Sequence, residues 1–98
     1  MGTEQMDTDD LSDEAYAIIV HAAKACDTLK TELGVLSYDC ENEDAWLEKV
    51  QTRLNAIAKD PDEFVEYWNL EEEEGIDASQ MKRIVQKLSR RVDAIRCQ

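Results

Sequence analysis

The sequence predicts an all-α fold, a small up-down bundle of three long helices and one short helix. Its apolar residues recur at steps of three and four, the period that gives a helix one buried face. One proline and three glycines are too few for the many turns of a β-sandwich or barrel. Capping residues precede each apolar pattern and divide the chain into segments. The predicted helices cover residues 13–33, 43–59, 61–74 and 78–96.

The first helix is predicted over residues 13–33, with Ser12 as its N-cap. Two carboxylates follow Ser12 in the first turn, where they face the positive end of the helix dipole. Gly34 is predicted to end the helix, because glycine readily adopts the left-handed conformation found after many helices. The apolar stripe runs through the whole segment: Ala15, Ile18, Ala22, Cys26, Leu29 and Leu33.

The clearest local signal separates the second helix from the third. Asn42 is the predicted N-cap of the helix over 43–59. In the short helix, Asp60 is a capping residue, Pro61 suits the first helical position and Glu63 completes a capping box. The apolar side of the short helix is Phe64, Val65, Tyr67 and Trp68. We expect these aromatic side chains, including Trp68, to close one end of the core; the alternative is a recognition surface.

The last helix carries the chain's clearest charge asymmetry. Asp77 and Gln80 stand where a helix begins, and the apolar stripe that follows is the width of one buried seam. Residues 78–98 hold six basic residues and one acidic residue, whereas the rest of the chain holds five basic and 22 acidic residues. That stripe is Met81, Ile84, Val85, Leu88, Val92 and Ile95.

Two segments are predicted along the chain: a flexible acidic tail over residues 1–11, which lack periodicity, and a single helical domain over 12–98. No apolar run is long enough to span a bilayer. The three cysteines are odd in number and lack C-x-x-C spacing, so we expect free thiols and a cytoplasmic location.

The sequence predicts no catalytic residue, metal site or cofactor. His21 is the only histidine, and the positions three and four residues away from it hold no metal ligand. We therefore expect His21 to be a half-buried histidine of ordinary kind. The single glycines form no phosphate-binding loop, and the serines form no nucleophile motif.

The leading functional prediction is a non-catalytic binding protein. A net charge of −12 disfavours direct contact with nucleic acid or with an anionic membrane and favours a basic protein partner. One form of this function is an inhibitor or mimic that occludes a partner's nucleic-acid-binding site. The opposite charge of the last helix also permits self-association.

The predicted contact is the acidic run Glu71, Glu72, Glu73 and Glu74, together with Tyr67. Four carboxylates beside the negative end of a helix dipole are unfavourable, so stability does not explain them. A solvated helix end is the plainer interpretation. A secondary basic face is predicted from Arg83, Lys87 and Arg90.

Two alternatives remain open at this stage. The first is a small metal-dependent phosphohydrolase that binds magnesium through glutamates at helical spacing. Its candidate residues are Glu63, Glu66, Glu71, Glu74 and Asp77. Such a site needs a second acidic helix opposite the first, whereas the other predicted helices face inward with apolar side chains. The second alternative is a subunit of a larger assembly.

Overall fold

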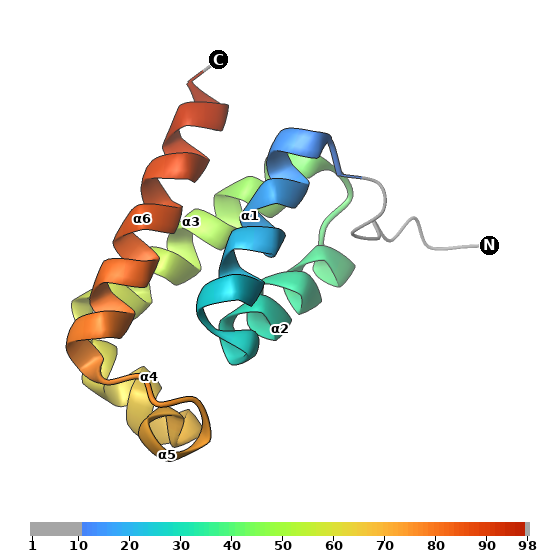
Figure 1. Cartoon of the computed structure of the whole chain (residues 1–98). Helices are drawn as coiled ribbons and strands as arrows, with labels where there is room; N and C mark the ends of the chain where they lie inside the picture. Colours follow the sequence, from blue (N-terminus) through green and yellow to red (C-terminus); the bar gives the residue numbers. More distant parts are fainter. Residues whose placement is uncertain (1–10, 98) are drawn as a thin grey trace.

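A computed structural model describes residues 11–97, of which 85% are helical and none form a strand, so the predicted all-α fold is confirmed (Figure 1). The predicted tail lies outside the described residues except for Leu11, which is buried beside the first helix. The elements are α1 (Asp13–Ala25), α2 (Asp27–Leu36), η2 (Ser37–Asp39), α3 (Glu43–Lys59), α4 (Pro61–Trp68), α5 (Leu70–Glu73) and α6 (Ala78–Arg96).

The helix α6 is the centre of the packing. It lies along α3 and also contacts α1 and α4, while α2 packs against α1 and α3 (Figure 1). The apolar stripes of these helices meet in one hydrophobic cluster. Trp46 of α3 is the largest of its fully buried side chains. The predicted ranges of α3 and α6 match the structure at both ends.

The predicted helix over 13–33 is wrong in one respect, because the chain breaks at Cys26. Cys26 is extended, with φ −159° and ψ 112°, and it divides the segment into α1 and α2. The apolar stripe nevertheless stays buried on both sides of the break, and Cys26 itself is only 1% exposed. The periodicity therefore identified the buried residues correctly but concealed the change of direction.

A carboxylate far along the chain caps the new helix end. Cys26 makes no side-chain capping bond at the start of α2. Instead, Glu74 accepts hydrogen bonds from the backbone N–H of Asp27 at 2.7 Å and of Thr28 at 3.0 Å. The Thr28 hydroxyl donates a third bond at 2.7 Å. Glu74 thus satisfies amide groups that have no partner within α2 and places a negative charge at the positive end of its dipole.

The predicted end of the first segment at Gly34 is also wrong, since α2 continues to Leu36. Carbonyl groups in the last turn of a helix lack donors of their own. Here the Trp46 indole N–H donates to the Leu33 oxygen at 2.9 Å, and the Ser37 hydroxyl donates to the Gly34 oxygen at 2.8 Å. The tertiary donor from Trp46 and the local donor from Ser37 support the last turn of α2, past the predicted end at Gly34.

Alanine substitutions at Gly34 and Gly75 should change the stability of the fold in opposite directions. A Cβ at Gly34 would have no atom within 4 Å, and its backbone is helical, so Gly34→Ala should raise the free energy of unfolding by about 0.5–1 kcal/mol. Gly75 has φ +67°, a left-handed conformation that alanine disfavours, so Gly75→Ala should lower the free energy of unfolding by about 1–2 kcal/mol. Urea denaturation measures both. A loss of stability in Gly34→Ala would contradict the helical assignment of Gly34.

The predicted short helix over 61–74 is divided at Asn69, which adopts the left-handed conformation with φ 54°. Asp60 caps α4 as expected, accepting from the Glu63 N–H at 3.2 Å. A capping box at α4 would also need the Asp60 N–H to donate to the Glu63 side chain. That N–H donates instead to the Ile57 oxygen at the end of α3. Two helices that share one junction residue cannot both use its amide. The complete capping box forms instead between Asp77 and Gln80 of α6.

Candidate interaction surfaces

Residues 66–73, here called the acidic-aromatic segment, span the end of α4 and all of α5. Leu70 is fully buried and fixes the segment to the core, and its carbonyl accepts a hydrogen bond from the Ile76 N–H at 3.1 Å. Because Asn69 turns the chain in the left-handed conformation, α5 starts in a new direction. Every residue of the segment other than Leu70 is exposed.

Two aromatic side chains of this segment are exposed side by side. Tyr67 is 76% exposed and Trp68 is 38% exposed, and their rings meet edge to face with centroids 5.0 Å apart. The expectation that Trp68 lines the core is therefore wrong. Tyr67, which is also part of the predicted partner contact, lies at the surface. Phe64 and Val65 alone close the core at this end, each 5% exposed. Exposed Tyr and Trp are the side chains most enriched at binding hot spots.

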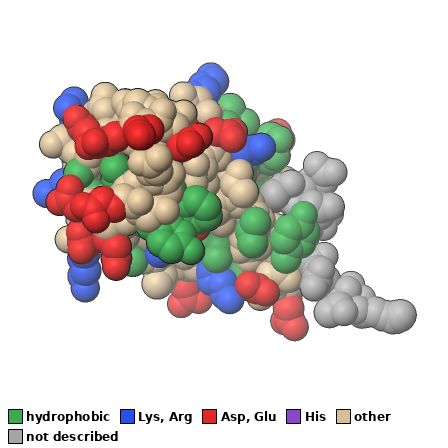
Figure 2. Space-filling model, turned by 90° about the horizontal axis from the view of Figure 1, so that it is seen from below, with side chains coloured by type: hydrophobic (Ala, Val, Ile, Leu, Met, Phe, Trp, Pro, Cys, Tyr) green, Lys and Arg blue, Asp and Glu red, His purple; other side chains and the backbone are tan. Residues whose placement is uncertain are grey.

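Carboxylates surround these aromatic rings without any basic side chain in the local sequence. Residues 60–81 contain nine acidic residues and no Lys, Arg or His. Glu71, Glu72 and Glu73 are all exposed. Figure 2, which looks at the molecule from below the view of Figure 1, shows Asp and Glu side chains gathered in clusters with hydrophobic side chains between them.

Glu74 differs from the other three members of the acidic run. Its bonds to Asp27 and Thr28 stabilise the fold, so the inference that stability cannot explain the run is wrong for this residue. Desolvation by burial opposes its ionisation, but the hydrogen bonds from Thr28, Asp27 and Cys26 outweigh that effect and lower the pKa of the carboxyl. Burial, with a contribution from Glu74, raises the pKa of the Cys26 thiol to about 11. Glu74 is therefore a structural cap.

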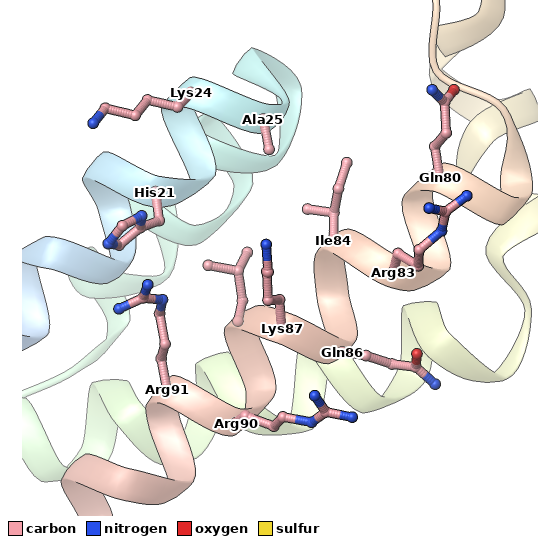
Figure 3. A pocket seen from close by; sticks show the side chains of 11 residues that line it. His21, Lys24, Ala25, Gln80, Arg83, Ile84, Gln86, Lys87, Arg90 and Arg91 are labelled. Carbon is pink, nitrogen blue, oxygen red and sulfur yellow. The ribbon is translucent and has the colours of Figure 1, made fainter.

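A second surface of opposite sign lies between α1 and α6. Here the described residues form an open groove of about 760 Å³ (Figure 3). Its lining contains five basic side chains and no carboxylate: Lys24, Arg83, Lys87, Arg90 and Arg91. Ala25, Ile84 and Leu88 supply an apolar floor. The predicted basic face on the last helix thus forms part of a larger site, here called the basic groove, to which α1 adds Lys24 and His21.

The side chains of the basic groove do not all point into it, since Lys24 on α1 extends away from α6 (Figure 3). Figure 3 shows Arg91 and His21 pointing toward one another and Lys87 projecting into the gap between α1 and α6, whereas Arg90 points to the other side of α6. Burial, followed by the positive charges of Arg91, Lys24 and Lys87, lowers the pKa of His21. Sequence reasoning left His21 and Lys24 out of the site, because only the packing of α1 on α6 brings them there.

The structure brings together no metal site among residues 11–97: no three His, Cys, Asp or Glu side chains there are placed to hold a metal ion. Of the glutamates proposed for a phosphohydrolase, Glu63, Glu66 and Glu71 are exposed, whereas Glu74 is bonded to the start of α2. Within the same residues, no helix is long and apolar enough to cross a membrane. Comparison with protein-family models, with curated proteins and with solved structures gives no match to this chain.

Proposed function

We propose that this chain is a non-catalytic binding protein, and that the acidic-aromatic segment contacts a basic protein partner. The observation that carries the proposal is the exposed Tyr67–Trp68 pair set among carboxylates. Exposing two large aromatic rings leaves apolar surface in water, so their position is not explained by folding alone. A basic partner covers the rings and neutralises the carboxylates at the same time.

Arginine is the partner side chain that this surface suits best. Its guanidinium stacks on aromatic faces and also forms bidentate bonds to carboxylates. The chain already uses such a contact internally, since the Arg53 guanidinium lies 5.6 Å from the Phe64 ring and pairs with Glu32 at 2.9 Å. An inhibitor that occupies the nucleic-acid-binding site of an arginine-rich partner is the specific form of this proposal. Free thiols at all three cysteines support the proposed cytoplasmic location.

The charge part of the proposal is tested by binding kinetics with a labelled arginine-rich peptide across a salt series. The variant Glu71→Gln/Glu72→Gln/Glu73→Gln leaves the Glu74 cap intact. Opposite charges mainly accelerate association, so this variant should associate about tenfold more slowly at low salt and with a flatter salt dependence. Its dissociation rate should change less.

A matched control separates local contact from net charge. Asp39→Asn/Glu41→Gln/Glu48→Gln removes three other exposed carboxylates and gives the same net charge of −9. The control should associate at nearly the wild-type rate. Equal slowing of both triple variants would contradict a local contact, because the peptide would then sense only the overall charge.

The aromatic part is tested by the preference between arginine-rich and lysine-rich peptides of the same length. Tyr67→Ala should reduce affinity for the arginine peptide by about two- to fivefold and narrow that preference. Tyr38→Ala is the control, since Tyr38 is 53% exposed and lies outside the acidic-aromatic segment. An unchanged preference in Tyr67→Ala would remove the aromatic pair from the proposal.

A further inference from the structure

The basic groove is the feature that the acidic character of the chain does not explain. In a protein with 23 acidic and 11 basic residues, five cations line one groove without a carboxylate among them. Among the described residues the only salt bridge is Arg53–Glu32, so none of these five cations forms an ion pair there. All five are exposed, although Arg90 points to the other side of α6 (Figure 3).

Helix stability does not account for this arrangement. Arg83, Lys87 and Arg91 follow one another at intervals of four residues along α6. Like charges at that spacing destabilise a helix, by about 0.2–0.5 kcal/mol for each pair. The helix dipole favours cations only in its last turn, and α6 runs on to Arg96, so Arg83 and Lys87 gain little from it.

From this we infer that the basic groove binds an acidic, amphipathic segment of a partner protein. The charge complementarity comes mainly from Arg83, Lys87 and Arg91 of α6, with Lys24 of α1 also among the lining residues. The floor supplies the second requirement, because half-buried Ile84 and exposed Ala25 leave apolar surface between the two helices, whereas Leu88 is nearly covered. A segment with carboxylates flanking an apolar side chain matches both.

The dimensions limit the length of that segment. The lining runs from Gln80 to Arg91, which at 1.5 Å per helical residue is about 17 Å. An extended peptide covers that distance with about five residues, and a helix with about three turns. Screening restricts the attraction to about 10 Å at 0.1 M salt, so a short segment in the groove senses mainly the local cations. A long polyanion such as nucleic acid extends beyond the groove and meets the negative remainder of the chain, which disfavours it.

The test is fluorescence anisotropy of the full chain with a labelled amphipathic peptide in which glutamates flank leucines. Wild type should bind this peptide, and it should not bind the matched peptide with glutamine in place of glutamate. The variant Arg83→Gln/Lys87→Gln/Arg91→Gln should lose at least about tenfold in affinity, which is a change of about 1.4 kcal/mol. Its thermal midpoint should be unchanged or raised, because like-charge repulsion along α6 is removed.

The control is Lys30→Gln/Lys49→Gln/Lys82→Gln, which removes three exposed cations outside the groove and reaches the same net charge of −15. It should retain binding within about twofold. Equal losses in both triple variants would overturn the inference. Tighter binding of a single-stranded oligonucleotide, or displacement of the peptide by millimolar inorganic phosphate, would also overturn it in favour of a phosphate ligand. If light scattering gives the groove variant a lower molecular mass than wild type, the groove binds a second copy of this chain instead.

Discussion

Replacing Trp46 with alanine should nearly unfold the protein. The indole is fully buried between α3 and the rest of the core, and it is the largest such side chain. Truncation of a buried Trp to Ala costs about 3–5 kcal/mol, through lost burial and the cavity that remains. The Leu33 carbonyl also loses its donor, which lies at 2.9 Å, in the last turn of a helix that offers no replacement. A small domain has about 5–15 kcal/mol in total, so at the low end of that range little stability would be left.

Two further variants separate the effect of the lost indole N–H from that of the lost apolar volume, and a core position from a surface one. Trp46→Phe keeps most of the apolar volume but removes the indole N–H, so it should cost about 1–3 kcal/mol. Trp68→Ala removes the same type of side chain from a partly buried position, 38% exposed, and should cost about 1–2 kcal/mol, less than Trp46→Ala. Urea denaturation of the three variants measures these differences. A larger loss for Trp68→Ala than for Trp46→Ala would reverse the assignment of core and surface.

Glu74→Gln should destabilise the fold more than any other single neutralisation in the acidic run. The amide of glutamine places donors where the Asp27 and Thr28 amide groups also donate, and it removes the charge from the start of α2. Loss of a charged cap costs about 1–3 kcal/mol. The control is Glu73→Gln, which makes the same chemical change at the neighbouring exposed position and should be near neutral.

The effect of Glu74 also has a defined pH dependence. Its pKa is lowered in the folded protein from the ordinary value of 4.5, so the folded state holds this proton less tightly than the unfolded state. The stabilisation is therefore present above about pH 4.5 and is lost as the pH falls through the folded pKa. The stability gap between wild type and Glu74→Gln should be full at pH 7 and should narrow below pH 4.5. A gap that stays constant down to pH 2 would show that the carboxylate charge does not contribute.

Local sequence signals were sufficient for much of this fold. The helices α3 and α6 begin at Asn42 and Asp77, whose side chains cap them, and their boundaries follow from those caps and from the apolar period. The break at Cys26 was missed because the apolar period continues through it. The Glu74 carboxylate that caps the new helix end is 48 residues away in sequence from Cys26 and leaves no local mark.

The two candidate surfaces were predictable to different degrees, because the local sequence shows charge but does not show how helices pack. The charge of α6 is visible in the sequence, and so is the acidic run at 71–74. The conversion of a basic helix face into a groove depends on α1 lying beside it, which no local pattern specifies. Likewise, a helix period through Trp68 predicts burial, but the left-handed turn at Asn69 ends α4 and leaves the indole half in water.

Partners of opposite charge should bind this chain at two separate surfaces, and nuclear magnetic resonance can map both. Uniformly 15N-labelled protein is titrated first with the unlabelled arginine-rich peptide and then, in a fresh sample, with the acidic amphipathic peptide. We expect the arginine-rich peptide to shift amide signals within residues 66–73, and the acidic peptide to shift signals of the groove residues 21–25 and 80–91. Shifts from both peptides over the same residues, or shifts spread evenly over every charged surface, would contradict this expectation.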